Sequence, residues 1–230
     1  MSEGLLLLFD IDGTLLLQAT REHAEGMYAA LRRVHRIEIP ERRFQMAGMT
    51  DRAIARRLLE FAGVPGHAIE AHAETVRRLT IEEFRRRCRP DMGRFVSPGI
   101  PEVLGRLASD ERMRLSLLTG NFEPVARLKL SRAGIGGFFP EGQGAFGCDH
   151  EDRTELPPIA RARAAVNGSP WPAERTVIIG DTPRDIACAR ADGARVVAIA
   201  TGPYGPDELT DADEVVTSPR DLPDAIAGLR

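Results

Sequence analysis

The chain of 230 residues lacks the features that would place it in several specialised classes of protein. Its three cysteines, Cys88, Cys148 and Cys188, are odd in number and far apart, which argues against a disulfide framework and against a paired zinc site. The apolar run at residues 5–9 is too short to span a bilayer, and Glu3 precedes it where a secretory signal would carry basic residues. We therefore expect a cytoplasmic protein with no membrane partner.

The chain also lacks a large charge of either sign. The formal net charge is -3, which gives no general reason to expect nucleic acid as a partner. Residues 17–95 carry 16 arginines against 11 acidic residues, but Lys129 is the only lysine, so the arginine content partly reflects composition. We interpret the arginine runs as solvated helix faces. The choice between a monomer and a homodimer stays open.

What the sequence does contain is a series of short apolar runs that end in polar or glycine residues. The first covers residues 4–9 and is followed by Asp10. Similar runs cover residues 114–118, 176–179 and 195–200. Helical patterns separate them, at about residues 100–109, 122–133, 155–167 and 183–192. This alternation predicts an α/β fold with a doubly wound parallel sheet, in which ligands bind at the carboxyl ends of the strands.

Residues 17–95 interrupt that alternation. They contain no convincing strand and have helical patterns at about residues 20–36, 51–62 and 68–88. Apolar positions such as Ile69, Ala73 and Val76 recur at helical spacing, as expected for buried helix faces. We predict two domains, an α/β core of residues 1–16 and 96–230 and an all-helical cap of residues 17–95.

Two carboxylates follow the first predicted strand. Asp10 and Asp12 are two residues apart, so an extended chain points both side chains the same way. Carboxylates this close repel each other, and a hard divalent cation is their natural partner. Gly13 and Thr14 then permit a tight turn whose backbone N–H groups suit a phosphate. The alternative is an ordinary turn, in which this sequence pattern is common.

Other predicted strand ends add polar groups to the same edge of the sheet. Thr119, Gly120 and Asn121 follow one strand. Asp181 follows another, and Asp185 lies one helical turn beyond it. These groups, with the basic residue Arg184, predict a crevice lined by four carboxylates, a hydroxyl and a basic side chain. For Asp185 a structural interpretation is the alternative, because an acidic residue also complements the dipole of a helix that begins nearby.

Taken in order, these motifs resemble those of the haloacid dehalogenase superfamily. Residues 10–15, 118–121 and 180–185 fit its first, second and fourth motifs, and the resemblance spans essentially the whole chain. It implies a Rossmann-like core with a helical cap of the C1 type inserted between the first two motifs. Phosphoglycolate phosphatases and β-phosphoglucomutases have the most similar pattern.

The third motif is the departure from the family pattern. A lysine is expected in the interval before the fourth motif, but Arg153 occupies that interval. A guanidinium can bridge a phosphoryl oxygen and a carboxylate, so Arg153 is our candidate. Lys129 is the competing candidate, although it lies in a predicted helix that we interpret as structural.

The resemblance implies a role for each matched residue. Asp10 is the nucleophile and Asp12 the acid and base, as in magnesium-dependent phosphatases that form an aspartyl phosphate. Mg²⁺ is expected on Asp10, on the backbone carbonyl of Asp12 and on Asp181, with Asp185 close by or acting through water. Thr119 and Arg153 are expected to hold the phosphoryl group, together with the backbone of Gly13, Gly120 and Asn121.

A stretch of the cap, residues 46–52, resembles the segment that faces the active site in capped relatives. Thr50 and Arg52 are therefore candidate contacts to the substrate, which we expect to be a small phosphorylated metabolite. The alternative for Thr50 is a structural one, since it can cap a helix that begins at Asp51.

Single residues distinguish some of the related activities of this superfamily. A phosphomutase shares every motif and stays open. Dehalogenases of the superfamily usually lack the acid and base, so Asp12 favours phosphate esters. Phosphonoacetaldehyde hydrolases use a cap lysine, and residues 17–95 contain none. A non-catalytic binding or regulatory protein of the same fold should have lost a key carboxylate, whereas all four are present.

Overall fold

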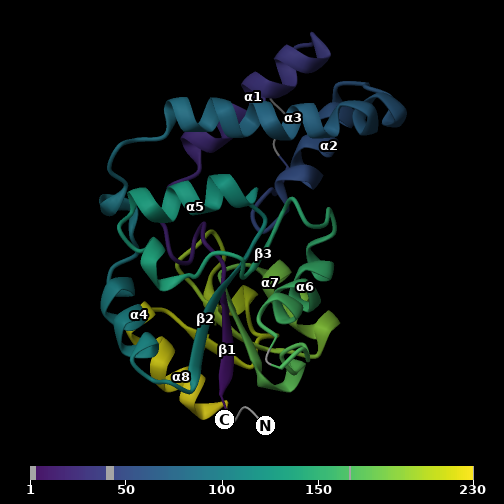
Figure 1. Cartoon of the computed structure of the whole chain (residues 1–230). Helices are drawn as coiled ribbons and strands as arrows, with labels where there is room; N and C mark the ends of the chain where they lie inside the picture. The colour runs from purple at the N-terminus through teal and green to yellow at the C-terminus, as the bar shows by residue number, and fades with distance from the viewer. Residues whose placement is uncertain (1–3, 40–43, 166, 230) are drawn as a thin grey trace.

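A six-stranded parallel sheet forms the centre of the computed structural model, which describes residues 4–39, 44–165 and 167–229 (Figure 1). The strand order is β3-β2-β1-β4-β5-β6. The strands are β1 (Leu5–Phe9), β2 (Met113–Thr119), β3 (Ala145–Phe146), β4 (Thr176–Gly180), β5 (Arg195–Ile199) and β6 (Glu214–Val216). Every pair of neighbouring strands is parallel. The predicted fold class is confirmed.

Helices cover both faces of this sheet, and the central strand explains why. All five residues of β1 are buried, and successive side chains of a strand point to opposite faces. Leu7 and Phe9 join one apolar cluster and Leu6 and Leu8 join another. The first cluster includes residues of α4 (Ile100–Ala108), α5 (Glu123–Arg132) and α8 (Leu222–Gly228). The second includes residues of α6 (Leu156–Arg163) and α7 (Pro183–Asp192).

The register of β1 determines what lies beside Asp10. Phe9 pairs with Leu117 of β2 on one side and with Ile179 of β4 on the other. Asp10 therefore leaves the sheet between the ends of these two strands, and its backbone N–H still donates to the Ile179 carbonyl at 2.9 Å. The polar residues that follow β1, β2 and β4 meet at one edge of the sheet.

Three further helices lie beyond this edge (Figure 1). They are α1 (Arg21–His35), α2 (Asp51–Phe61) and α3 (Gly66–Arg87), and they share an apolar cluster of their own. The two chain segments that connect them to the sheet lie side by side, because Leu16 forms a bridge with Val96 and Leu17 N–H donates to the Phe95 carbonyl at 2.7 Å. The boundaries of the core and cap domains stay a prediction.

Among the strands and α-helices of the described residues, two strands and one helix were not predicted, and one helix is shorter than expected. Strands β3 and β6 have two and three residues, too few to show a periodicity, and the short helix α8 was also missed. The helix expected over residues 155–167 ends at Arg163, before Asn167 and Gly168, which both have positive φ. Residue 166 of that prediction lies outside the described residues.

Within the described ranges, no helix has both the length and the apolar character needed to cross a membrane. The cytoplasmic location stays a prediction.

Candidate active site

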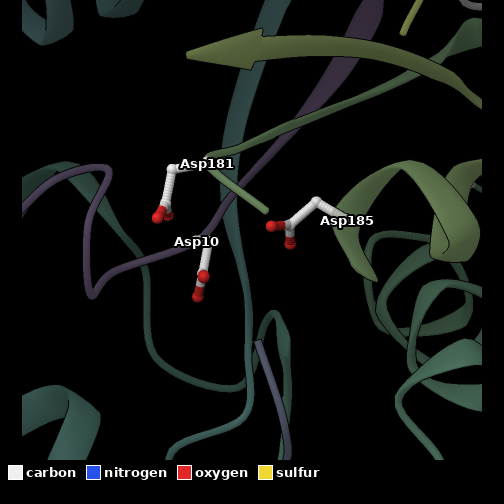
Figure 2. A group of neighbouring side chains, drawn as sticks. All are labelled: Asp10, Asp181 and Asp185. Atoms are coloured by element: carbon white, nitrogen blue, oxygen red, sulfur yellow. The ribbon is translucent and has the colours of Figure 1, made fainter. Parts of the chain in front are cut away.

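Three aspartates from separate elements lie together at the carboxyl edge of the sheet (Figure 2). Asp10 directly follows β1, Asp181 directly follows β4, and Asp185 belongs to the first turn of α7. One carboxylate oxygen from each lies within 4.8 Å of the others, and all three side chains are buried. The predicted convergence of these strand ends is therefore present in the structure.

Hydrogen bonds from neighbouring threonines position two carboxylates of this cluster, those of Asp181 and Asp185. Thr14 Oγ1 donates to Asp181 Oδ1 at 2.9 Å, whereas Asp181 Oδ2 has no hydrogen-bond partner among the described residues. Thr182 donates to Asp185 Oδ2 from its backbone N–H at 3.0 Å and from its hydroxyl at 2.7 Å. The bond from the Thr182 backbone N–H belongs to a capping box at the start of α7. Asp185 thus caps the helix and also belongs to the acidic cluster.

Burial makes the negative charge of this cluster costly. It raises the pKa of Asp10 to about 6, and the nearby Asp185 carboxylate acts in the same direction. Burial also raises the pKa of Asp181 to about 8, with Asp10 and Asp185 adding repulsion. The buried, unpartnered Asp181 Oδ2 and the all-oxygen donor set fit a hard cation such as Mg²⁺.

Arg153 partly compensates the same charge. It lies in a short 3₁₀ helix, Arg153–Glu155, that precedes α6, and it is buried. Its Nη2 atom lies 2.7 Å from Asp185 Oδ1 and 3.2 Å from Asp10 Oδ2. Burial opposes the charge of the guanidinium, but Asp10 and Asp185 outweigh it and raise the pKa of Arg153. The candidate for the third motif therefore contacts the predicted nucleophile.

Asp12 has a different set of partners. Lys129 Nζ lies 2.8 Å from Asp12 Oδ1 and 2.7 Å from Asp12 Oδ2, and Asn121 Nδ2 donates to Asp12 Oδ2 at 2.8 Å. The predicted acid and base thus points toward the loop before α5 and the second half of that helix, and its carboxylate is not part of the three-aspartate cluster. Both candidates for the third motif therefore reach the site, but Arg153 contacts Asp10 and Asp185 whereas Lys129 contacts Asp12.

The remaining predicted phosphate-binding positions lie around these carboxylates. Thr119 is buried at the end of β2, and its Oγ1 accepts from Asn121 Nδ2 at 3.3 Å. Gly13 has φ +95°, and a Cβ there would overlap Asp181. A Cβ at Gly120 would overlap the backbone carbonyl of Met49 in the segment before α2. Both glycines therefore permit close approaches that a side chain would block.

A cavity of about 620 Å³ lies between this edge of the sheet and helices α1 and α2. Asp10, Asp12, Thr119 and Arg153 line it on the side of the sheet. The opposite side is mainly apolar and is lined by Ala24, Met27, Tyr28, Met49, Ile54 and Leu58. The cavity has the size of a site for a small molecule.

Thr50 and Arg52, the predicted substrate contacts of the cap, point elsewhere in this structure. Thr50 Oγ1 accepts from Ala53 N–H at 3.2 Å, as a helix cap does, and donates to the Glu151 carbonyl at 2.6 Å. Arg52 pairs with Glu70 at 3.1 Å and with Glu151 at 3.2 Å. Neither residue lines the 620 Å³ cavity. Their role in substrate binding stays a prediction without support from these contacts.

Two contacts of the site were not expected from the sequence. The first is the ion pair between Lys129 and Asp12. Lys129 shares the buried face of α5 with Val125 and Ala126, and this helical spacing could have indicated that its side chain points inward. Asp51 Oδ2 accepts from Phe122 N–H at 2.6 Å and lies 3.1 Å from His23 Nε2. No local pattern signals this second contact, because its partners are far apart in the chain.

The sequence profile of the haloacid dehalogenase-like hydrolases matches residues 7–190, which include every residue of the acidic cluster and both basic residues. The chain belongs to this family of enzymes. A second profile, HAD-hydrolase-like, matches residues 157–226. The resemblance seen in the sequence motifs is confirmed.

Individual relatives agree with this assignment. A phosphoglycolate phosphatase from Rhodospirillum rubrum is 27% identical over 208 residues, which cover 85% of this chain and 79% of the relative. The structure of β-phosphoglucomutase from Clostridium difficile has a TM-score of 0.70 at 17% identity, covering 100% of this chain and 97% of that one. CbbY from Rhodobacter sphaeroides, solved with phosphate, has a TM-score of 0.69 at 18% identity, covering 94% and 95%. The two structures share the fold of this chain.

Proposed function

We propose that this member of the family is a magnesium-dependent phosphatase that hydrolyses a small phosphomonoester through an aspartyl phosphate on Asp10. The observation that carries the proposal is the position of Asp10. It lies at the carboxyl end of the central strand, lines the cavity, belongs to the acidic cluster and contacts Arg153. The match to a phosphoglycolate phosphatase supports the same reaction class.

In the first step a carboxylate oxygen of Asp10 attacks phosphorus. A new P–O bond forms to Asp10 while the bond from phosphorus to the ester oxygen breaks. Asp12 donates a proton to the leaving oxygen, which departs as an alcohol. The two aspartates have separate partners in the structure, and this separation suits two different roles.

In the second step a water molecule attacks the phosphorus of the aspartyl phosphate. Asp12 accepts a proton from this water, the bond from phosphorus to Asp10 breaks, and inorganic phosphate leaves. Asp10 is restored as a carboxylate. Covalent catalysis of this kind divides one difficult displacement into two easier ones.

Asp10 and Asp181 would hold Mg²⁺, with the backbone carbonyl of Asp12 and with Asp185 close by. The ion supplies positive charge that reduces the repulsion between the carboxylates and the phosphate. Arg153 adds a second cation beside Asp10. Thr119 and the backbone at Gly13, Gly120 and Asn121 would orient the phosphoryl oxygens.

The cavity supports a small substrate, because its apolar side leaves room for a short organic group above the phosphate. The names of similar proteins include phosphoglycolate phosphatase and CbbY, the latter also solved with xylulose-(1,5)bisphosphate. We therefore propose a small phosphorylated metabolite as the substrate class. The similarity to β-phosphoglucomutase concerns the fold, so a mutase is tested alongside hydrolysis.

A screen of phosphorylated metabolites with Mg²⁺ tests this proposal. We expect release of inorganic phosphate from p-nitrophenyl phosphate and from at least one small metabolite, and loss of this activity in Asp10→Asn and in excess chelator. Isomerised phosphosugar without phosphate release would instead favour a mutase. Activity that persists in Asp10→Asn would overturn the nucleophile.

A further inference from the structure

Lys129 is a buried cation that the proposed two-step reaction leaves without a role. It is the only lysine of the chain, its relative exposure is 0%, and it lies in the second half of α5. A buried ammonium is costly unless it is paired and hydrogen-bonded. Its ion pair with Asp12 meets this condition, because Nζ contacts both carboxylate oxygens.

The contact constrains the direction of Asp12. Lys129 approaches from α5, while Asn121 Nδ2 donates to Asp12 Oδ2 from the loop after β2. The Asp12 side chain nevertheless keeps a relative exposure of 19% and lines the cavity. Two donors therefore hold the Asp12 carboxylate, and part of its surface stays open to the cavity.

We propose that Lys129 is a positioning residue that holds Asp12 in place for proton transfer to the leaving oxygen of the ester. This inference rests on the proposed function, in which Asp12 is the acid and base. Lys129 itself touches neither the phosphoryl group nor the nucleophile in this scheme. Its effect reaches the reaction through Asp12, since a small displacement of a catalytic group is enough to lower a rate by about 10²-fold.

A positioning role of this kind predicts a dependence on the leaving group. An alkoxide leaves poorly without a proton, whereas p-nitrophenolate leaves readily without one. The value of kcat/KM reports the steps up to the formation of the aspartyl phosphate, so it isolates this first proton transfer. Loss of the Lys129 contact should therefore lower kcat/KM more for an alkyl ester than for an aryl ester.

The experiment compares Lys129→Met with the unaltered enzyme on glycerol 2-phosphate and on p-nitrophenyl phosphate, both with Mg²⁺. We expect kcat/KM to fall about 10²-fold on the alkyl ester. On the aryl ester, kcat/KM should fall by only about tenfold or less. Arg127→Met is the matched control, because it removes a basic side chain from the same helix. The partners of Arg127 are Glu123 and the carbonyls of Phe139 and Gln143, and Asp12 is not among them. It should leave the ratio between the two esters unchanged.

A double-mutant cycle with Asp12→Asn completes the test, and it covers the case in which Lys129→Met alone fails to fold. Adding Lys129→Met to Asp12→Asn removes both charges of the pair and should cause no further loss of kcat/KM on glycerol 2-phosphate. An equal fall on both esters in Lys129→Met, or a further loss in the double variant, would overturn the positioning role. Failure of the proposed function appears separately, as activity that survives Asp10→Asn.

Discussion

Arg153 joins two of the three clustered aspartates, since one guanidinium nitrogen contacts Asp10 and Asp185. Removing this side chain would leave two buried carboxylates without this cation and would remove the proposed donor to the phosphoryl group. The loss should be independent of the leaving group, in contrast to the loss expected for Lys129. The two basic residues can therefore be distinguished by kinetics.

We predict that Arg153→Ala lowers kcat/KM by about 10²- to 10³-fold on glycerol 2-phosphate and on p-nitrophenyl phosphate alike. Arg153→Lys should recover part of the activity, because an ammonium supplies the charge without the planar fork. Steady-state kinetics with Mg²⁺ measures both variants. Activity of Arg153→Ala within a few-fold of the unaltered enzyme would remove Arg153 from the proposed mechanism.

For single residues, the sequence predicts the place of a side chain in the fold better than it predicts the partners of that side chain. Asp10 and Asp181 were found because parallel strands end at one edge, whatever the details of packing. The partner of Asp12 was not found, because it depends on how α5 approaches the sheet and on how far the Lys129 side chain reaches.

The start of α2 contacts two of the loops at the carboxyl edge of the sheet. Asp51 N–H donates to the Gly120 carbonyl at 2.8 Å, and its carboxylate accepts from Phe122 N–H at 2.6 Å. Thr50 caps the same helix and donates to Glu151. One helix end thus contacts the loop after β2 and the segment before Arg153.

Thr50→Ala tests whether Thr50 acts through the helix or through the substrate. Loss of the cap should lower the free energy of unfolding by about 0.5–2 kcal/mol, and KM should change little, because Thr50 does not line the cavity. Denaturant unfolding and steady-state kinetics give the two values. A large rise in KM with unchanged stability would restore the predicted substrate contact.

Longer elements were predicted more closely than short ones. Helices α1, α2 and α3 begin and end within two residues of their predicted bounds, since their apolar positions repeat over several turns. Strand β3 has only two residues, and its place beside β2 depends on pairing between distant segments.

On the scale of the whole molecule, we expect the buried acidic cluster to make stability depend on pH and on the proposed Mg²⁺. The pKa values of Asp10 and Asp181 are raised to about 6 and about 8 in the folded protein. An unfolded chain releases these protons at lower pH. The contribution of both groups to stability is therefore present at low pH and is lost as the pH rises through about 6 and then about 8.

We predict that, in the presence of a chelator, Asp181→Asn gains thermal stability relative to the unaltered protein when the pH is raised from about 5 to about 8, the range over which the raised carboxyl pKa values act. Mg²⁺ should raise the Tm of the unaltered protein more at the higher pH than at the lower, and should raise that of the variant less. Thermal unfolding at both pH values gives these differences. A difference in Tm between variant and unaltered protein that stays constant with pH would contradict this account of the cluster.

Direct detection of a phosphoryl group on Asp10 tests the central claim most closely. The enzyme is mixed with Mg²⁺ and p-nitrophenyl phosphate, quenched in acid during turnover, and treated with borohydride, which reduces an acyl phosphate but leaves a free carboxylate intact. Mass spectrometry of the peptide that contains Asp10 should show reduction at Asp10, and none in Asp10→Asn. Reduction at another residue, or continued turnover in which no reduced peptide is detected, would contradict the proposed mechanism.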